Sequence, residues 1–192
     1  LVNCNHSQPL GPPLGEISHH LPLSRLYFGN KSIEAHHPYG IRKYAGLVSI
    51  KEYRPSTNAG MFDGFMQLPF ELIISQSFSF INRMIAIAGM QLQQRRLIQA
   101  EDVATSQIQE IDEALDSAMS GEFAFGNHHL SVLCIEDTPK ALETALSLAI
   151  IELSNAGIVG VRERMNMEPA YWAQLPGNAE YMARRSTVNT FN

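Results

Sequence analysis

Apolar and polar residues alternate most regularly in the segment FELIISQSFSF, residues 70–80. Successive side chains of an extended chain point to opposite faces, so this segment has one apolar face and one polar face. The apolar face is expected to hold Leu72, Ile74, Phe78 and Phe80, and the polar face Glu71, Ser75, Ser77 and Ser79. The pattern predicts a strand of an antiparallel sheet with an open or lightly covered face.

Shorter patterns predict the other small elements. Further strands are predicted at residues 43–53, 125–137 and 158–164. Residues 25–36 predict a hairpin that turns at Gly29 and Asn30. Residues 61–69 predict a short helix that ends at Pro69.

One amphipathic helix is predicted in the C-terminal half of the chain. Asp137 or Thr138 is suited to cap its N-terminus, and Pro139 falls in the first turn, where an N–H is not needed. Its apolar stripe comprises Leu142, Ala145, Leu146, Ala149, Ile150 and Leu153. Gly157 is expected to end this helix, and Pro169 to open a last short one.

Residues 82–119 have helical propensity but the wrong charge order for one long helix. Arginines come first and acidic residues follow, which would place cations at the positive end of the helix dipole and anions at its negative end. A break near Gln99 to Ser106 corrects much of this, and Ser106 and Gln109 have the spacing of a capping box. We therefore predict two antiparallel helices or a sharp bend.

The order of these elements is strand, helix, strand, helical insertion, strand, helix, strand. It predicts an α+β fold with a ferredoxin-like (split βαβ) antiparallel sheet and a helical insertion between the two halves. The proline-rich residues 1–24 lack periodicity and are predicted to be an extended lead-in. Residues 25–192 are predicted to form a single α+β domain, with the insertion at about 82–119.

Composition narrows the class of protein. The 192 residues, 45% of them hydrophobic, suffice for one core, and the net charge of −5 without a basic block argues against direct nucleic-acid binding. Cys4 and Cys134 lack metal-ligand spacing, which favours free thiols in the cytoplasm. No apolar run approaches the roughly 18 residues of a membrane-spanning helix. Because the chain starts at Leu1, we expect it to be a fragment of a longer protein.

Candidate reactive motifs each fail a test of spacing. The segment GNKS has Asn30 where a phosphate loop needs a glycine before Lys31. Adjacent histidines in an extended chain face opposite sides, so one of each pair is expected to pack and the other to be solvated. These pairs are His19-His20, His36-His37 and His128-His129. Residues 162–164, Arg-Glu-Arg, are expected at an exposed or interface strand end. We assign no catalytic, cofactor-binding or metal-binding residue.

The octet YWAQLPGN, residues 171–178, contains the single tryptophan. Its Pro-Gly pair predicts a type II turn, in which Pro176 presets the first central residue and Gly177 adopts a positive φ. Tyr171, Trp172 and Leu175 are expected to dock on the sheet from one side of a helical turn. The structural or interface candidates are Trp172, Gln174, Leu175, Pro176, Gly177, Asn178 and Arg184.

Four segments in this order resemble the amino-terminal domain of the CagE/TrbE/VirB ATPases of bacterial type IV secretion and conjugation systems. They are NAGMFDGFMQLPFELIISQSFSFI, GEFAFGNHHLSVL, AGIVGVRE and YWAQLPGN, followed by Arg184 and Asn189 to Phe191. The resemblance covers roughly residues 21–191. The tail RRSTVNTFN departs from the usual ending of the family, in which Ile and Ser precede Asn-Phe.

The resemblance implies a large oligomeric ATPase at the cytoplasmic face of the bacterial inner membrane, which energises channel assembly and the export of protein or DNA. Its ATP and Mg²⁺ bind in a later motor domain that these residues do not include, so the fragment itself is expected to hold no cofactor. The fragment is expected to be a non-catalytic domain that docks the motor on inner-membrane and cytoplasmic secretion subunits and on other copies. An interface stripe is expected along the acidic residues 106–119.

Two alternatives remain open. The chain could instead be a free-standing small α+β enzyme, for which a deep pocket around His128 or His129 with a perturbed carboxylate is expected. It could also be a metal-binding domain, which metal analysis would detect.

Overall fold

The computed structural model describes residues 24–54, 56–99, 111, 115–116, 119–120 and 124–189. The predicted lead-in therefore lies outside the described residues, apart from Ser24. The chain divides into two compact units. The first unit comprises Leu1–Arg54, Asn58–Gln76 and Leu130–Arg184, and the second Pro55–Thr57, Ser77–His129 and Arg185–Asn192. That residues 25–192 form a single domain stays a prediction.

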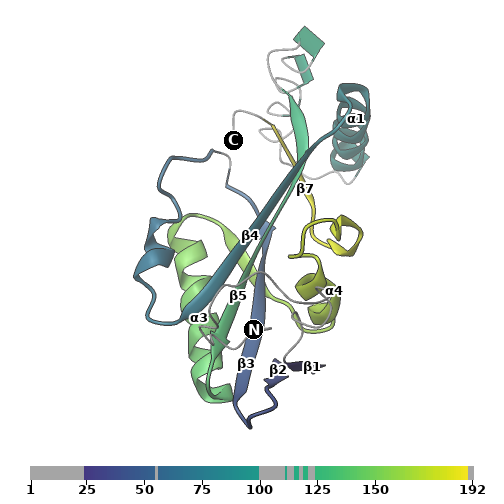
Figure 1. Ribbon diagram of the computed structural model, residues 1–192. Coiled ribbons are helices and arrows are strands. Elements are labelled where there is room, and N and C mark those ends of the chain that lie inside the picture. The colour runs from purple at the N-terminus through teal and green to yellow at the C-terminus, as the bar shows by residue number, and fades with distance from the viewer. Residues whose placement is uncertain are drawn as a thin grey trace, which may run out of the picture. The chain divides into compact units, whose positions relative to one another are not determined.

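Seven strands form one sheet (Figure 1). They are β1 (Arg25–Phe28), β2 (Ile33–His36), β3 (Arg42–Glu52), β4 (Glu71–Phe80), β5 (Phe125–Glu136), β6 (Val159–Arg162) and β7 (Ser186–Asn189). Their order is β1-β2-β3-β5-β4, with β6 paired to β3 and β7 paired to β5. The α+β class and the antiparallel sheet are confirmed.

The ferredoxin-like split is not confirmed in detail, although one βαβ unit can be traced. Val48 and Ser49 of β3 pair antiparallel with both β5 and β6, so these two strands run in the same direction on opposite edges of β3. Helix α3 (Pro139–Asn155) connects them, which makes one split βαβ unit. Among the described residues between β3 and β4, the only helix is the short 3-10 helix η2 (Asp63–Gln67), so no counterpart of α3 is seen there.

Helix α3 begins and ends where the sequence predicts. The Thr138 hydroxyl accepts a hydrogen bond from the Ala141 N–H at 3.2 Å, and Pro139 occupies the first turn. At the other end, Gly157 has a φ of 76° and donates its N–H to the Ser154 carbonyl, while Ile158 donates to Leu153. These two bonds make a Schellman motif, which requires the left-handed residue that glycine tolerates.

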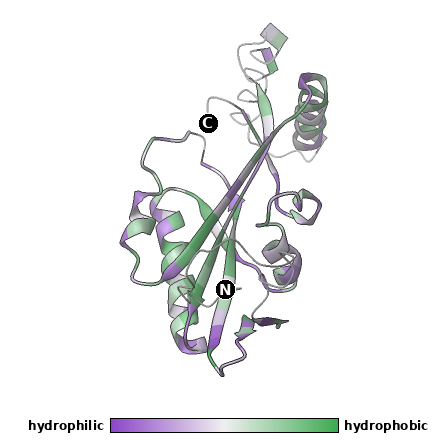
Figure 2. Ribbon diagram, in the orientation of Figure 1, coloured by the Kyte–Doolittle hydropathy of each residue, from purple (hydrophilic) through white to green (hydrophobic). Residues whose placement is uncertain are grey.

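In the first unit, the sheet carries a core on each face. Alternate residues of β3 and β5 point to opposite sides, and both strands are buried through their middle. Figure 2 shows hydrophobic residues along both strands. The core beside α3 contains Val48, Ile50, Leu130, Val132, Leu142, Ala145, Leu146, Ala149 and Leu153. The core on the other face contains Ile33, Ala45, Leu47, Leu133, Ile135, Met167, Ala170 and Tyr171. The second core positions α4 (Met167–Trp172) and the octet that follows it.

The predicted apolar face of β4 is covered only near its start, where the partly buried Leu72 packs against the core beside α3. Ile74 is 37% exposed, Phe78 44% and Phe80 75%. Strand β4 ends the strand order, so it is an edge strand, and alternation defines two faces without showing which one is covered. The Phe78 ring lies over Gly126, where a Cβ atom would come within 2.1 Å of the ring. It packs edge-on against Phe80.

The second unit contains α1 (Arg83–Gln99), the first residues of β5 and strand β7. Asn82 starts α1: its side-chain Oδ1 accepts the Met84 N–H at 2.8 Å. Residues 111, 115, 116, 119 and 120 are also helical. Residues 100–110 lie outside the described range, so the predicted break near 99–106 stays a prediction. Most of the predicted acidic stripe at 106–119 also lies outside it.

Among the described residues of the second unit, four buried ones form a small core. They are Ala86, Ile87, Leu115 and Phe125. Across the described residues, no helix has both the length and the apolar character needed to cross a membrane.

Candidate functional site

The octet forms the end of α4 and a tight turn. Leu175 donates its N–H to the Trp172 carbonyl at 3.1 Å, and Asn178 donates to the Leu175 carbonyl at 3.2 Å. Gly177 has a φ of 90°, as the third residue of a type II turn requires. The Asn178 side chain also donates to the Trp172 carbonyl at 3.1 Å. The predicted turn is therefore present and is closed by its own hydrogen bonds.

The aromatic residues of the octet pack against the first hairpin. Tyr171 is buried, and its ring meets Phe28 of β1 with a centroid distance of 5.5 Å. The partly buried Trp172 lies 6.1 Å from the same ring. Leu175 is 48% exposed, so the prediction that it docks beside the two rings is wrong. The helix has ended by then, and the turn carries Leu175 away from the helical face.

Trp172→Ala is expected to lower the free energy of unfolding by about 2 kcal/mol, below the range for a fully buried ring, because this ring is only partly buried. Chemical denaturation monitored by circular dichroism measures the loss. Leu175→Ala is the matched control in the same octet and should change the midpoint little. Equal losses for the two variants would contradict the packing described here.

Two polar side chains connect the C-terminal part of the first unit to the sheet. Gln174 donates its amide to the fully buried Ser131 hydroxyl of β5 at 3.1 Å. Arg184 donates its Nε–H to a Glu163 carboxylate oxygen at 2.6 Å. The Glu163 side chain is 2% exposed and that of Arg184 40%. Both candidates thus hold backbone segments together; their assignment as interface residues stays a prediction.

The expected exposure of residues 162–164 is wrong for Glu163. Its backbone N–H donates to the Leu47 carbonyl at 2.8 Å, which holds the end of β6 against β3. Its buried carboxylate needs a charged partner, and Arg184 supplies one from 21 positions further along the chain. The residues next to Glu163 give no sign of its contact with Arg184. Residues 162–164 therefore look equally exposed in the sequence.

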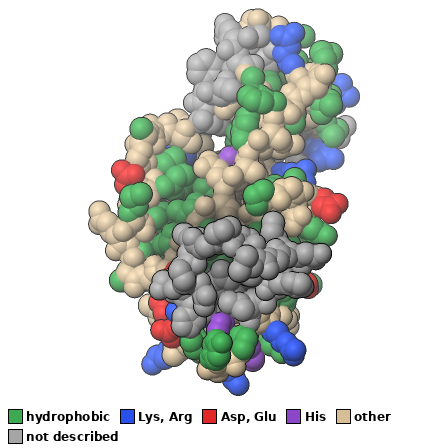
Figure 3. All heavy atoms as spheres, in the orientation of Figure 1, with side chains coloured by type: hydrophobic (Ala, Val, Ile, Leu, Met, Phe, Trp, Pro, Cys, Tyr) green, Lys and Arg blue, Asp and Glu red, His purple; other side chains and the backbone are tan. Residues whose placement is uncertain are grey.

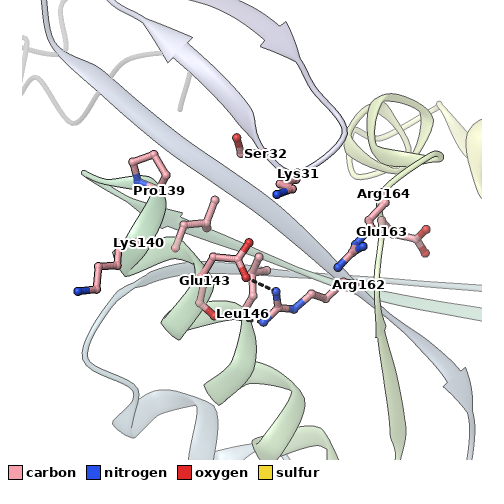
Figure 4. Close-up of a pocket in the computed structure, with 10 residues that line it drawn as sticks. Lys31, Ser32, Pro139, Lys140, Glu143, Leu146, Arg162, Glu163 and Arg164 are labelled. Carbon is pink, nitrogen blue, oxygen red and sulfur yellow. Dashed lines mark hydrogen bonds and ion pairs between the residues drawn. The ribbon is translucent and has the colours of Figure 1, made fainter.

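A basic hollow lies where the β1–β2 turn, the start of α3 and the end of β6 meet (Figure 4). Its volume is about 540 Å³. Its lining residues are Lys31, Ser32, Pro139, Lys140, Leu142, Glu143, Leu146, Arg162, Glu163 and Arg164. We call these ten lining residues the basic hollow.

Arg162 and Glu143 form the fixed centre of the basic hollow. The guanidinium is paired with the Glu143 carboxylate, and its Nη2 donates to the Glu143 carbonyl at 3.2 Å and to the Ser147 hydroxyl at 2.7 Å. The hydrogen bond and charge of Arg162 lower the pKa of Glu143, with smaller contributions from Arg164 and Lys31. The pair is therefore complete above the normal pKa of Glu143 and is lost as the pH falls through its lowered value.

Helix α1 of the second unit presents apolar residues on two sides. Ala86, Ile87 and Met90 face the small core. Met84 is 69% exposed and Ile85 68%, and Leu92, about two turns further along the same outer side, is 49% exposed. We call Met84, Ile85 and Leu92 the outer face of α1.

Basic residues and a second hollow accompany this helix. Arg83, Arg95 and Arg96 lie on α1, which has no acidic residue. Figure 3 shows basic and hydrophobic side chains beside one another over α1. A hollow of about 480 Å³ is lined by residues of α1, β5 and β7, including Ile85, Met90 and Val188.

Each of the two histidine pairs that the structure describes has one buried and one partly buried member, and His19-His20 lies outside the described residues. His37 and His129 are buried, and His36 and His128 are partly buried. Burial lowers the pKa of His128, with a smaller contribution from His129. Neither of the two hollows includes His128 or His129. Within the described part of the chain, no three His, Cys, Asp or Glu residues are grouped as a metal site.

Cys134 lies in the core beside α3. Burial raises the pKa of its thiol to about 12, so it stays protonated near neutral pH. Cys4, the other cysteine, falls outside the described residues.

A family profile and the sequences of curated proteins both match this chain to components of type IV secretion systems. The sequence profile of the CagE, TrbE, VirB family, described as a component of the type IV transporter system, matches residues 1–184. The type IV secretion system protein virB4 of Bartonella henselae is 42% identical over 178 residues, which are 93% of this chain and 23% of that protein.

Two other relatives have similar coverage. Protein virB4 of Agrobacterium tumefaciens is 32% identical over 193 residues, covering 100% of this chain and 24% of the relative. PtlC of Bordetella pertussis is 30% identical over 187 residues, covering 97% and 23%. The chain thus spans about a quarter of the length of the curated relatives it matches.

Proposed function

Because the chain belongs to the CagE, TrbE, VirB family, a component of the type IV transporter system, we propose that it is the amino-terminal docking domain of a type IV secretion ATPase. In this proposal the domain is non-catalytic and holds the motor against secretion subunits at the cytoplasmic face of the bacterial inner membrane. ATP and Mg²⁺ act in the motor domain, and the whole ATPase works as an oligomer. Relatives named as type IV secretion proteins support the system to which it belongs.

The exposed, apolar outer face of α1 is the main support for the docking role. A surface helix of a globular protein normally has one apolar stripe and one polar side. Helix α1 buries one apolar side against its small core and leaves Met84, Ile85 and Leu92 exposed on another. Exposed apolar side chains gathered on one element mark an interaction surface.

The charge of α1 supports a partner of opposite charge. Its three arginines give the rim of the outer face a positive charge. A complementary surface has an apolar centre and acidic residues around it. The proposed partner is a secretion subunit with such a surface.

The double variant Met84→Glu, Leu92→Glu tests this function in the full-length ATPase, in cells that carry its secretion system. Glutamate keeps high helix propensity, so α1 should remain folded while its outer face becomes acidic. We expect secretion subunits to stop co-purifying with the ATPase and substrate transfer to fall at least about tenfold, the loss that 1.4 kcal/mol of binding energy produces.

The matched control is Met66→Glu, Ile151→Glu, which changes two apolar residues outside α1 that are at least as exposed as Met84 and Leu92. It should leave co-purification and transfer intact, and both variants should retain ATP hydrolysis. Normal subunit recovery with the α1 variant would contradict the proposal. Loss of self-association alone would identify the outer face as a contact between copies, and loss of binding to anionic vesicles alone would identify a membrane surface.

A further inference from the structure

The basic hollow has an excess of positive charge on an acidic chain. Four cationic residues and two acidic residues line it, which gives 4 − 2 = +2, whereas the chain as a whole carries −5. Each of the two acids already has an arginine partner, Arg162 for Glu143 and Arg184 for Glu163. Among the described residues, Lys31, Lys140 and Arg164 make no ion pair. The hollow therefore holds cations whose charge its own residues do not neutralise.

These cations come from three separate segments. Lys31 lies in the β1–β2 turn, Lys140 in the first turn of α3, and Arg164 just after β6. Figure 4 shows Lys31, Arg162 and Arg164 around Glu143. Both Lys31 and Arg164 act on the Glu143 carboxylate through space, which places the two cations near it. The convergence depends on the fold, because these residues are far apart in the sequence.

The Arg162 guanidinium at the centre of the hollow is held in place and still has N–H donors for an anion. Arg162 is held by three acceptors, the Glu143 carboxylate, the Glu143 carbonyl and the Ser147 hydroxyl. A guanidinium has five N–H donors, so its Nε–H and one Nη1–H are not used by these bonds. A cation fixed in place loses less conformational entropy when a ligand binds.

We propose that the basic hollow binds a carboxylate side chain in an acidic peptide segment of a partner subunit. The inference rests on the proposed docking function and names the chemistry of a second contact, separate from the outer face of α1. The carboxylate pairs with Lys31 and Arg164 at the exposed mouth, beside the fixed pair of Arg162 and Glu143. Lys140 attracts neighbouring acidic residues of the same segment.

A carboxylate suits this site better than a phosphate group. Glu143 already places one negative charge in the hollow, and it would repel a doubly charged phosphate more than a singly charged carboxylate. The lining also includes Pro139, Leu142 and Leu146 next to the charged residues. Apolar lining beside cations fits a peptide, in which acidic and apolar side chains alternate with backbone.

Binding of a fluorescent hexaglutamate peptide to the full-length ATPase tests the proposal by fluorescence anisotropy. Lys31→Glu, Arg164→Glu should weaken binding at least about tenfold, and the milder Lys31→Gln, Arg164→Gln should weaken it less. Both positions are exposed, so the variants should keep the melting temperature and ATP hydrolysis of the parent.

The matched control is Arg25→Glu, Arg42→Glu, which makes the same charge change on exposed residues of β1 and β3 that both pair with His36, at the end of β2 away from the β1–β2 turn. It should retain most of the binding. Equal weakening by the two double variants would overturn the proposal, because it would show attraction to net charge alone. Displacement of the peptide by pyrophosphate at much lower concentration than by unlabelled hexaglutamate would overturn it in favour of a phosphate ligand.

The two tests fail in different ways. If the hollow variants lose the peptide but the α1 variant retains its secretion subunits, the docking function fails while the anion site stands. If the α1 variant loses its subunits and the hollow variants bind the peptide normally, only the present inference fails.

Discussion

Leu153→Ala is expected to lower the free energy of unfolding by about 2 to 5 kcal/mol, the largest stability loss among the substitutions considered. Leu153 is fully buried on α3, in the core beside that helix. It packs directly over β6, since a Cβ atom at Gly160 would approach its Cδ1 to 2.6 Å. Truncation leaves a void between the helix and the strand. Urea denaturation monitored by circular dichroism measures the loss.

Ile151→Ala is the matched control, because it removes a similar side chain from the same helix at a position 53% exposed. It should cost about 1 kcal/mol or less. Gly160→Ala provides a second check. Alone it should destabilise through the clash with Leu153, but in the Leu153→Ala background its methyl group enters the void and should cost less. Additive losses would show that the two residues are not in contact.

Glu163→Gln is expected to lower the free energy of unfolding by about 2 kcal/mol. The change keeps the shape of a buried side chain but removes the charge that Arg184 binds. The loss should fall below that of a fully buried ion pair, because Arg184 is 40% exposed and can turn to water. Chemical denaturation of the single variants and of the double variant with Arg184→Gln measures the coupling of the pair.

Glu168→Gln is the matched control, since Glu168 is exposed in the first turn of α4. It should change stability by less than about 0.5 kcal/mol. A coupling energy near zero between Glu163 and Arg184 would contradict the ion pair as a source of stability.

The sequence predicted correctly those elements that are determined by caps, turns and apolar stripes within a few neighbouring residues. The cap at Thr138, the glycine at 157 and the stripe between them define α3 in the sequence and in the structure. The Pro176-Gly177 turn is likewise determined by the residues inside it. In each case, backbone preferences and burial favour the same conformation.

Contacts between distant segments could not be predicted in this way. The alternation in β4 defines two faces, but the position of β4 at the end of the strand order leaves Phe78 and Phe80 exposed. The basic hollow forms from three segments, and nothing near Lys31 in the sequence indicates that Arg162 and Arg164 will lie beside it. Burial of Glu163 likewise depends on Arg184, which the chain brings back after α4 and the octet.

The ion pair between Glu163 and Arg184 closes a loop of the chain that contains α4, the octet turn and the 3-10 helix η3 (Ala179–Tyr181). Closing a loop of this size restricts the freedom of every residue inside it. Without the ion pair, the loop is held chiefly by two contacts. These are the packing of Tyr171 against Phe28 and the hydrogen bond from Gln174 to Ser131. Severing this one pair therefore releases the segment from α4 to η3 at its C-terminal end, and the segment opens locally while the sheet beneath it stays intact.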